Sequence, residues 1–269
     1  MIGGAGIWTP GCTVISGQQN LTQIIKSIFS VGGQGFAYDP NDLTTMWQDQ
    51  AKLLPVTGEG QPVWHILDKS GNNNHAFATS SATRPILQRN ATTGAYYLAF
   101  DGVDDFLQTN NIDFTSTDKV GLFAGVRKLS DANAGVVLEL GANYTNAFRI
   151  QAPSVAGAGN YDFRSGGATV SILTQSNINA PTSNTIVCKN SISENKATMR
   201  VSGFSGLSNT SNQGGGVFRN DPLYIGRRSI GSLPFNGHLY SLIGIGRLTT
   251  DSETIALEKS IAKNTGVAL

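Results

Sequence analysis

The chain has 269 residues, and its 19 Lys and Arg nearly balance its 18 Asp and Glu, which leaves a net charge of +1. This balance offers no electrostatic footprint for nucleic acid or for an acidic membrane surface, so we expect neither as a partner. Only 14% of the residues are charged while 32 residues are glycine, a composition typical of turn-rich β proteins. The sequence has no apolar run long enough for a transmembrane helix, and its first residues lack the basic and apolar regions of a secretory signal.

The first 35 residues differ from the rest of the chain. Residues 1–17 are rich in glycine and predict an extended arm. A helix follows, because Asn20 and Gln23 have the spacing of a capping box and apolar residues then recur on one helical face. That face consists of Leu21, Ile24, Ile25, Ile28 and Phe29. A helix of this length is marginal alone, so the face must dock either on its own domain or on a neighbouring subunit or protein.

From residue 36 onward, short apolar runs alternate with turn residues. Strands are expected near residues 37–38, 63–67, 96–100, 105–107, 120–126, 136–140, 147–150, 161–164, 169–173, 185–188, 197–201, 223–225 and 239–245. This pattern predicts an all-β fold, a two-sheet antiparallel sandwich. Residues 205–220 are expected to form one long exposed loop. Thr250 and Glu253 form a second capping box, which opens a short C-terminal helix that ends near residues 264–266.

Several segments resemble the concanavalin A-like, laminin G-like jelly-roll domain found in tailed-phage virion proteins. Residues 68–76 are similar to the family's Asp-x-Ser-Gly-Asn-Gly-Asn-His-Ala signature, with Asn73 in place of the second glycine. Residues 100–106 match its Phe-Asp-Gly-x-Asp-Asp-aromatic hairpin, and residues 225–253 match its last strands and final helix start. Residues 38–49 and 55–57 look like the opening of the phage version. The resemblance covers about residues 36–266 and implies a jelly-roll domain over residues 36–269, preceded by an anchor or assembly region in residues 1–35.

The resemblance also implies a function. We expect a non-enzymatic structural protein on the surface of a tailed-phage virion, either a head decoration or a tail fibre, made in the bacterial host cytoplasm. Its partners would be capsid or tail proteins, further copies of itself and a host-surface glycan. The residues expected to anchor it to the virion are Trp8, Leu21, Ile24, Ile25, Ile28 and Phe29. The alternatives are a stand-alone carbohydrate-binding lectin and a glycan-degrading hydrolase.

Three carboxylates within five residues, Asp101, Asp104 and Asp105, form a candidate calcium site, because calcium prefers oxygen ligands. The favoured interpretation is that Asp101 and Asp104 instead accept backbone N–H bonds in a tight hairpin, so no cofactor is expected and calcium is the alternative. The turn that begins at Asp68 has the same two interpretations, a ligand site or a self-satisfied turn in which His75 packs against the sheet.

The candidate carbohydrate site is the polar loop over residues 141–146. Tyr144 can stack on a sugar ring, while Asn143 and Asn146 can hydrogen-bond its hydroxyls. An ordinary surface tyrosine is the alternative interpretation. Trp47 and Trp64 have apolar neighbours and are predicted to lie in the core.

No catalytic constellation is apparent. In glycosidases of this fold the two carboxylates come from one strand with Glu-x-Asp-x-x-Glu spacing, and none of the five Glu residues has that pattern. Glu139 is the only one inside an expected central strand, and we predict that it is an outward-facing polar residue. Cys12 and Cys188 are expected to be free buried thiols, with a disulfide as the alternative.

Overall fold

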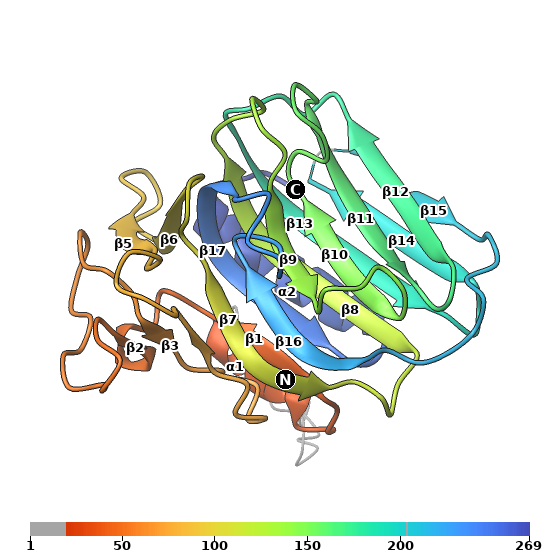
Figure 1. The fold of residues 1–269 in the computed structure, drawn as a ribbon, viewed down its shortest axis with the longest axis horizontal. Helices are drawn as coiled ribbons and strands as arrows, with labels where there is room; N and C mark the ends of the chain where they lie inside the picture. The colour runs from red at the N-terminus through yellow and green to blue at the C-terminus, as the bar shows by residue number, and fades with distance from the viewer. Residues whose placement is uncertain (1–19, 203) are drawn as a thin grey trace, which may run out of the picture.

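The part of the chain that the computed structural model describes, residues 20–202 and 204–269, is a sandwich of two antiparallel β-sheets (Figure 1). The expected fold class, an all-β jelly roll with a short helix near each end, is confirmed. The helices are α1 (Leu21–Phe29) and α2 (Asp251–Thr265), with one 3-10 turn at Leu43–Thr45. The described residues contain no helix that is both long and apolar enough to cross a membrane.

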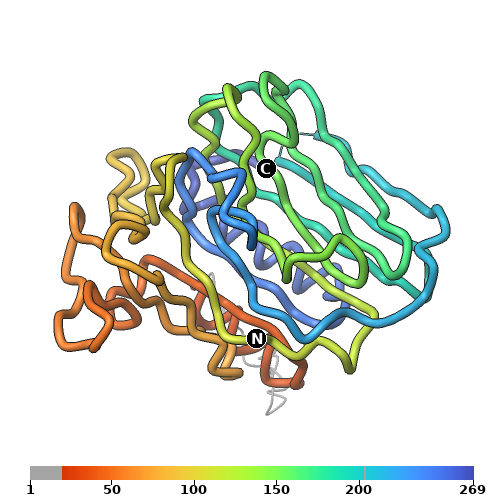
Figure 2. Tube along the Cα trace, viewed as in Figure 1, coloured from red at the N-terminus to blue at the C-terminus, as the bar shows by residue number. Residues whose placement is uncertain are grey.

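One sheet has eight strands and the other has nine. In spatial order the eight-stranded sheet consists of β15 (Leu207–Asn209), β14 (Lys196–Val201), β13 (Thr182–Ser191), β8 (Lys119–Lys128), β17 (Asn236–Ile245), β6 (Tyr96–Asp101) and β5 (Ile86–Arg89), and β1 (Gly35–Tyr38) also pairs with β17. The nine-stranded sheet consists of β12 (Val170–Ser176), β11 (Asn160–Gly166), β10 (Ala147–Gln151), β9 (Val136–Leu140), β16 (Asn220–Ile225), β7 (Leu107–Asp113), β4 (Ala76–Phe77), β3 (His65–Ile66) and β2 (Met46–Trp47). In Figure 2 the orange segment that carries β2 and β3 forms one end of the molecule, so these strands extend the nine-stranded sheet beyond β7.

The main core lies between the two sheets. Successive side chains of a strand point to opposite faces, so β9 contributes Leu138 and Leu140 to the core, while β10 contributes Phe148 and Ile150. Phe148 packs edge-on against Phe114, with ring centroids 5.6 Å apart. The side chains between these core positions therefore point to the outer face of the sheet.

Helix α1 packs on the sandwich of its own chain. Asn20 and Gln23 form the expected capping box. The apolar face of the helix is buried with residues of β1, β8, β13, β17 and α2, as this cluster shows: Leu21, Ile24, Ile25, Ile28, Ala37, Phe123, Val187, Ile243, Ile245, Leu257 and Ile261. Of the two docking alternatives, the structure has the internal one. The apolar face of the helix is buried against its own chain.

The prediction that these residues contact the virion is therefore wrong for the buried face of α1. Leu21, Ile24, Ile25 and Ile28 are each at most 5% exposed, and Phe29 packs against the same cluster. These side chains have no surface left for another protein. Trp8, the arm over residues 1–17 and Cys12 lie outside the described residues, so the arm remains a prediction.

Helix α2 covers the middle of the eight-stranded sheet. Thr250 and Glu253 form the expected capping box, and the helix ends at Gly266 with a φ of 75°. The helix approaches β8 closely at Gly125, where an added Cβ would lie 2.7 Å from a methyl carbon of Ile261. Glycine at this position lets the helix lie directly on the sheet.

Two other expectations need correction. Residues 205–220 are not one loop, because Leu207–Asn209 pair with β14 as an edge strand. Trp47 and Trp64 are half-buried rather than core residues, and only Trp64 packs partly against the core.

Candidate functional site

The outer face of the nine-stranded sheet is the part of the sandwich that the two helices leave open, since both lie on the eight-stranded sheet (Figure 1). Its strands pair so that one side chain from each stands directly opposite the next, and paired residues project from the same face. This set, which we call the open-face row, is Trp47, His65, Phe77, Gln108, Tyr224, Glu139, Arg149, Arg164 and Ile172. Eight strand spacings give the row a length of about 38 Å.

Glu139 is the centre of a charged cluster in this row. Its Oε1 accepts hydrogen bonds from Arg149 Nη1 at 3.1 Å and from Arg228 Nε at 3.2 Å. Its Oε2 accepts the backbone N–H of Ser229 at 3.0 Å. The prediction of an outward-facing residue is right for the sheet face, but the loop that carries Arg228 leaves Glu139 only 2% exposed. Both carboxylate oxygens therefore hold the loop against the strand.

Tyr144 lies over this cluster. The guanidinium carbons of Arg149 and Arg228 are 4.7 and 4.8 Å from the centroid of its ring, within cation–π range. Hydrogen bonding to Arg149, with the positive charge of Arg228, lowers the pKa of the Tyr144 hydroxyl. The side chain is still 50% exposed. The tyrosine expected from sequence to contact sugar thus lies on the open face, and both arginines contact its ring.

Several buried polar atoms around the cluster have no hydrogen-bond partner. They are Arg149 Nε, Gln151 Oε1, Asp162 Oδ1, Arg164 Nε and Ser229 Oγ. Gln151 on β10 pairs with Asp162 on β11, two residues along each strand from the row. Gln151 is 2% exposed and Asp162 is 3% exposed. An unsatisfied buried polar group costs about 1–3 kcal/mol. The set contains both donors and acceptors of hydrogen bonds.

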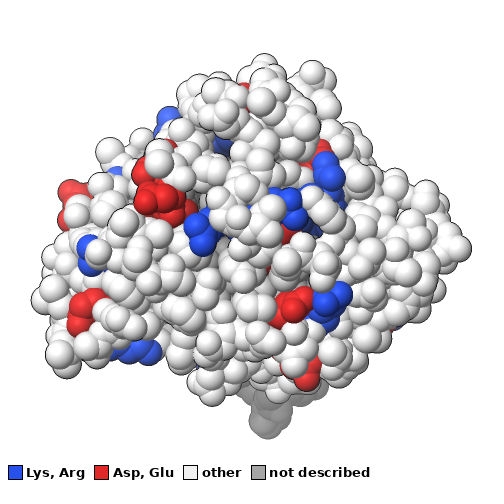
Figure 3. Space-filling model, viewed as in Figure 1, with Lys and Arg blue, Asp and Glu red and all other residues white. Residues whose placement is uncertain are grey.

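The space-filling view shows how this charge is distributed. In Figure 3 the blue atoms of Lys and Arg gather near the middle of the face, over the part of the sheet where β9, β10 and β11 run in Figure 1. Most of the surrounding surface is uncharged. The charged cluster is therefore a local feature of the open face.

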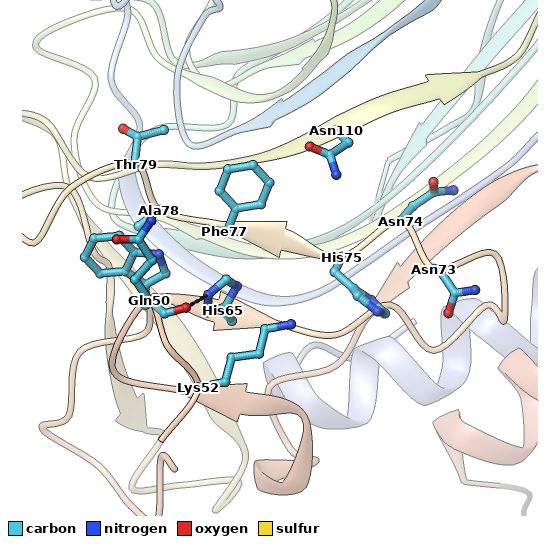
Figure 4. Close-up of a pocket in the computed structure, with 11 residues that line it drawn as sticks. Gln50, Lys52, His65, Asn73, Asn74, His75, Phe77, Ala78, Thr79 and Asn110 are labelled. Carbon is cyan, nitrogen blue, oxygen red and sulfur yellow. Dashed lines mark hydrogen bonds between the residues drawn. The ribbon is translucent and has the colours of Figure 1, made fainter. Parts of the chain in front are cut away.

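The other end of the row borders a cavity of about 530 Å³ (Figure 4). It is lined by Gln50, Lys52, Trp64, His65, Asn73, Asn74, His75, Phe77, Ala78, Thr79 and Asn110. In Figure 4, Lys52 reaches between the two histidine rings, and His65 Nε2 lies 3.0 Å from the Gln50 carbonyl oxygen. Burial lowers the pKa of both histidines, and the nearby Lys52 ammonium lowers it further. The lowered pKa favours the neutral form of both rings, which can donate and accept hydrogen bonds.

The turn that begins at Asp68 is self-satisfied. Its carboxylate accepts the backbone N–H groups of Ala37, Ser70 and Asn74 at 2.8 to 3.0 Å. His75 Nδ1 accepts the backbone N–H of Asp68 at 3.0 Å. The turn thus places His75 at the wall of the cavity, and the carboxylate itself has no free oxygen for a ligand.

The candidate calcium residues do meet in space. One ligand atom from each of Asp101, Asp104 and Asp105 lies within 4.8 Å of the others. Asp101 Oδ1 also accepts the backbone N–H groups of Val103 at 2.8 Å and of Asp104 at 3.3 Å, as a tight hairpin requires. Burial, together with the charge of Asp101, raises the pKa of Asp105 to about 7. The geometry therefore contains the hairpin bonds of the favoured interpretation and also the carboxylate cluster of the alternative.

Asn143 and Asn146 flank Tyr144, but only Asn143 is exposed. Asn146 takes up a φ of 55° and donates its amide to the Val217 carbonyl at 2.8 Å, so it supports the loop. Cys188 is a free, buried thiol, as expected.

The residues that sequence reasoning missed are those of the row itself. Arg149 and Arg164 lie in strands where polar residues alternate with apolar ones, and that alternation was the available signal for an outer face. Their pairing with Glu139 on β9 and with each other depends on strand register, which no local pattern specifies. The same holds for His65 and Phe77, which come from two-residue strands.

Comparison with known proteins supports the fold. No family model and no curated protein matches the chain. Among solved structures, an arabinofuranosidase complexed with arabinofuranosyl-α-1,2-xylobiose is similar over 90% of this chain and 65% of its own, with a TM-score of 0.55 and 11% identity. The botulinum neurotoxin serotype D ligand-binding domain, in complex with N-acetylneuraminic acid, is similar over 82% of this chain and 51% of its own, with a TM-score of 0.54 and 8% identity. The chain thus spans less than two thirds of either structure, and at these identities the likeness establishes the β-sandwich fold that the sequence resemblance predicts.

Proposed function

We propose that this protein is a non-enzymatic, lectin-like carbohydrate-binding module whose ligand lies on the open face of the nine-stranded sheet. The observation that carries the proposal is the set of buried, unpartnered donors and acceptors beside Glu139. Sugar hydroxyls donate and accept hydrogen bonds at once, so a glycan suits a face that holds both donors and acceptors, such as Arg149 and Asp162. The ligands of the two similar structures, an arabinofuranosyl xylobiose and N-acetylneuraminic acid, support the same ligand class.

Aromatic rings are placed to add stacking area. Trp47, Phe77 and Tyr224 each occupy a position of the row, and Tyr144 lies over its charged part. Rings with a polar edge supply contact area at low conformational cost, which suits the recognition of sugar rings. The row thus has the two elements of a glycan site, hydrogen-bonding groups and flat apolar surfaces.

A hydrolase is less well supported by this geometry. Glycoside hydrolysis needs one carboxyl group that donates a proton and a second that attacks or activates water. Glu139 is the central carboxylate of the face, and three hydrogen bonds from Arg149, Arg228 and Ser229 occupy its two oxygens. It therefore lacks a free oxygen for either role.

The virion setting rests on the sequence resemblance. We propose that the module is displayed on a tailed-phage particle, together with capsid or tail proteins and further copies of itself. Because the apolar face of α1 is buried, the anchor hypothesis is now limited to residues 1–19, which include Trp8. Deleting residues 1–19 is expected to abolish incorporation into particles while leaving the thermal midpoint of the domain unchanged. Incorporation that survives this deletion would remove the anchor hypothesis.

The binding test uses the full chain. We expect the wild type to bind a subset of an immobilised host-glycan panel, equally well in calcium and in EDTA. Tyr224→Ala, in the middle of the row, is expected to weaken binding roughly tenfold, which corresponds to about 1.4 kcal/mol. The matched control is Tyr97→Ala on the eight-stranded sheet, which should leave affinity unchanged. Absence of binding across the panel, or equal effects of the two variants, would contradict the proposal.

A further inference from the structure

Each end of the open-face row presents cationic side chains. At one end, Arg149, Arg164 and Arg228 form ion pairs with two carboxylates of the described part of the chain, those of Glu139 and Asp162. Lys52 stands at the other end, and the described residues that line its cavity include no Asp or Glu.

Asp49, whose charge acts on His65, is held by its own loop. Its carboxylate accepts the backbone N–H groups of Leu53 and Leu54 at 2.8 to 3.2 Å. Lys52 itself lies over the Trp47 ring, 5.9 Å from the centroid, and has no ion-pair partner among the described residues. Its ammonium is therefore available to a ligand anion.

The unpartnered polar atoms at the arginine end also favour an acidic ligand. Arg149 Nε, Arg164 Nε and Ser229 Oγ are donors, whereas Gln151 Oε1 and Asp162 Oδ1 are acceptors. A carboxylate on the ligand would accept from the guanidinium donors, and hydroxyls would donate to the two acceptors. A DNA backbone offers phosphate acceptors but no hydroxyl donors for Gln151 and Asp162, so it fits this set less well.

The two ends are too far apart for one sugar. His65 beside the cavity and Arg164 are separated by six strand spacings, about 29 Å. The side chains between them in the row are Phe77, Gln108, Tyr224, Glu139 and Arg149. A ligand that uses both ends must therefore be a chain of several sugars that runs across the strands.

From these observations we infer that the ligand is a linear acidic polysaccharide, with carboxylates along its length, that lies on the open-face row and contacts Lys52 at one end and the arginine cluster at the other. This inference rests on the proposed function and narrows it to one ligand class. Binding should be salt-dependent, because charges near the surface are screened. It should also strengthen with ligand length until both ends are engaged, since the second contact is then intramolecular.

The test measures affinity by titration calorimetry for oligogalacturonates and oligosialic acids of increasing length, from the dimer upward. Methyl-esterified oligogalacturonates are the neutral counterparts, and oligothymidylate is the nucleic-acid probe. Lys52→Gln removes the charge at the cavity. The double variant Asp162→Asn/Arg164→Gln removes a charge pair at the other end, so that no carboxylate is left unpaired. Lys196→Gln, on β14 of the other sheet, is the matched control, and thermal midpoints verify that each variant folds.

The long acidic oligomers are expected to bind at least tenfold more tightly than the dimers and than the esterified polymer. Each end variant should lower the affinity for long oligomers roughly tenfold, and Lys196→Gln should not change it. Equal binding of acidic and esterified polymers, or equal binding of oligothymidylate, would overturn the inference that the ligand is an acidic polysaccharide. The face would then still bind a polymer, but not by its carboxylates. Affinity that does not depend on length would overturn the spanning mode. If the wild type binds no acidic or neutral polymer, the proposed function itself fails.

Discussion

The two outer faces of this sandwich are built differently. On the eight-stranded sheet, β8 and β17 bear apolar residues on the outside as well as the inside, such as Phe123 and Ile243, and the helices α1 and α2 bury them. On the nine-stranded sheet, the corresponding outward positions hold Glu139 and Arg149, and no described helix covers them. The helical cover removes apolar surface from water, whereas the uncovered face keeps polar groups that only a ligand or water can satisfy. The difference separates the structural side of the molecule from the side available for recognition.

Removing the charge of Glu139 tests the uncovered face most strongly. Glu139→Gln leaves the guanidinium groups of Arg149 and Arg228, both nearly buried, without a counter-charge. We expect the free energy of unfolding to fall by about 3–5 kcal/mol, as when one partner of a buried ion pair is lost. Urea denaturation measures it, and the control is Glu59→Gln at an exposed position. A loss under about 1 kcal/mol would show that the cluster is solvated and that the open face is less organised than described.

Shortening Ile25 tests the covered face. The side chain is fully buried between α1 and the eight-stranded sheet, so Ile25→Ala should lower the free energy of unfolding by about 2–5 kcal/mol. Glycan affinity should stay at the wild-type value, because the open-face row lies on the other sheet. The matched variant Ile255→Ala, at a position 47% exposed on α2, should cost less than about 0.5 kcal/mol. If Ile25→Ala also weakened glycan binding, the two faces would be coupled.

Replacing Asp105, in the hairpin that joins the two sheets, is expected to have the smallest effect on stability. Asp105 lies between β6 of one sheet and β7 of the other, and its folded-state pKa is raised to about 7 from 3.8. The unfolded chain therefore loses this proton at lower pH than the folded protein, so Asp105 costs stability progressively as pH rises from about 4 to about 7. Asp105→Asn, which cannot ionise, should raise the thermal midpoint by a few degrees at pH 8 and by less at pH 5. The same measurement with calcium tests the alternative: a calcium-dependent midpoint in the wild type, lost in Asp105→Asn, would make the hairpin a metal site.

Sequence by itself determined the features that depend on near neighbours. The capping boxes at Asn20 and Thr250, the alternation that defines the sandwich strands and the Asp101 hairpin were all predicted, because each rests on residues within a few positions of one another. The class of the fold followed from their repetition along the chain.

Only the tertiary structure decided which faces are covered and what lies on the open one. Glu139 meets Arg228 across 89 residues of sequence, and its neighbours in the row come from β10 and β16 through strand register. A shift of one residue in register would move these side chains to the core face, and no local pattern specifies that register. The docking of α1 was equally undetermined, since an apolar helical face is satisfied by any apolar surface and only the assembled sheet shows that its own chain provides one.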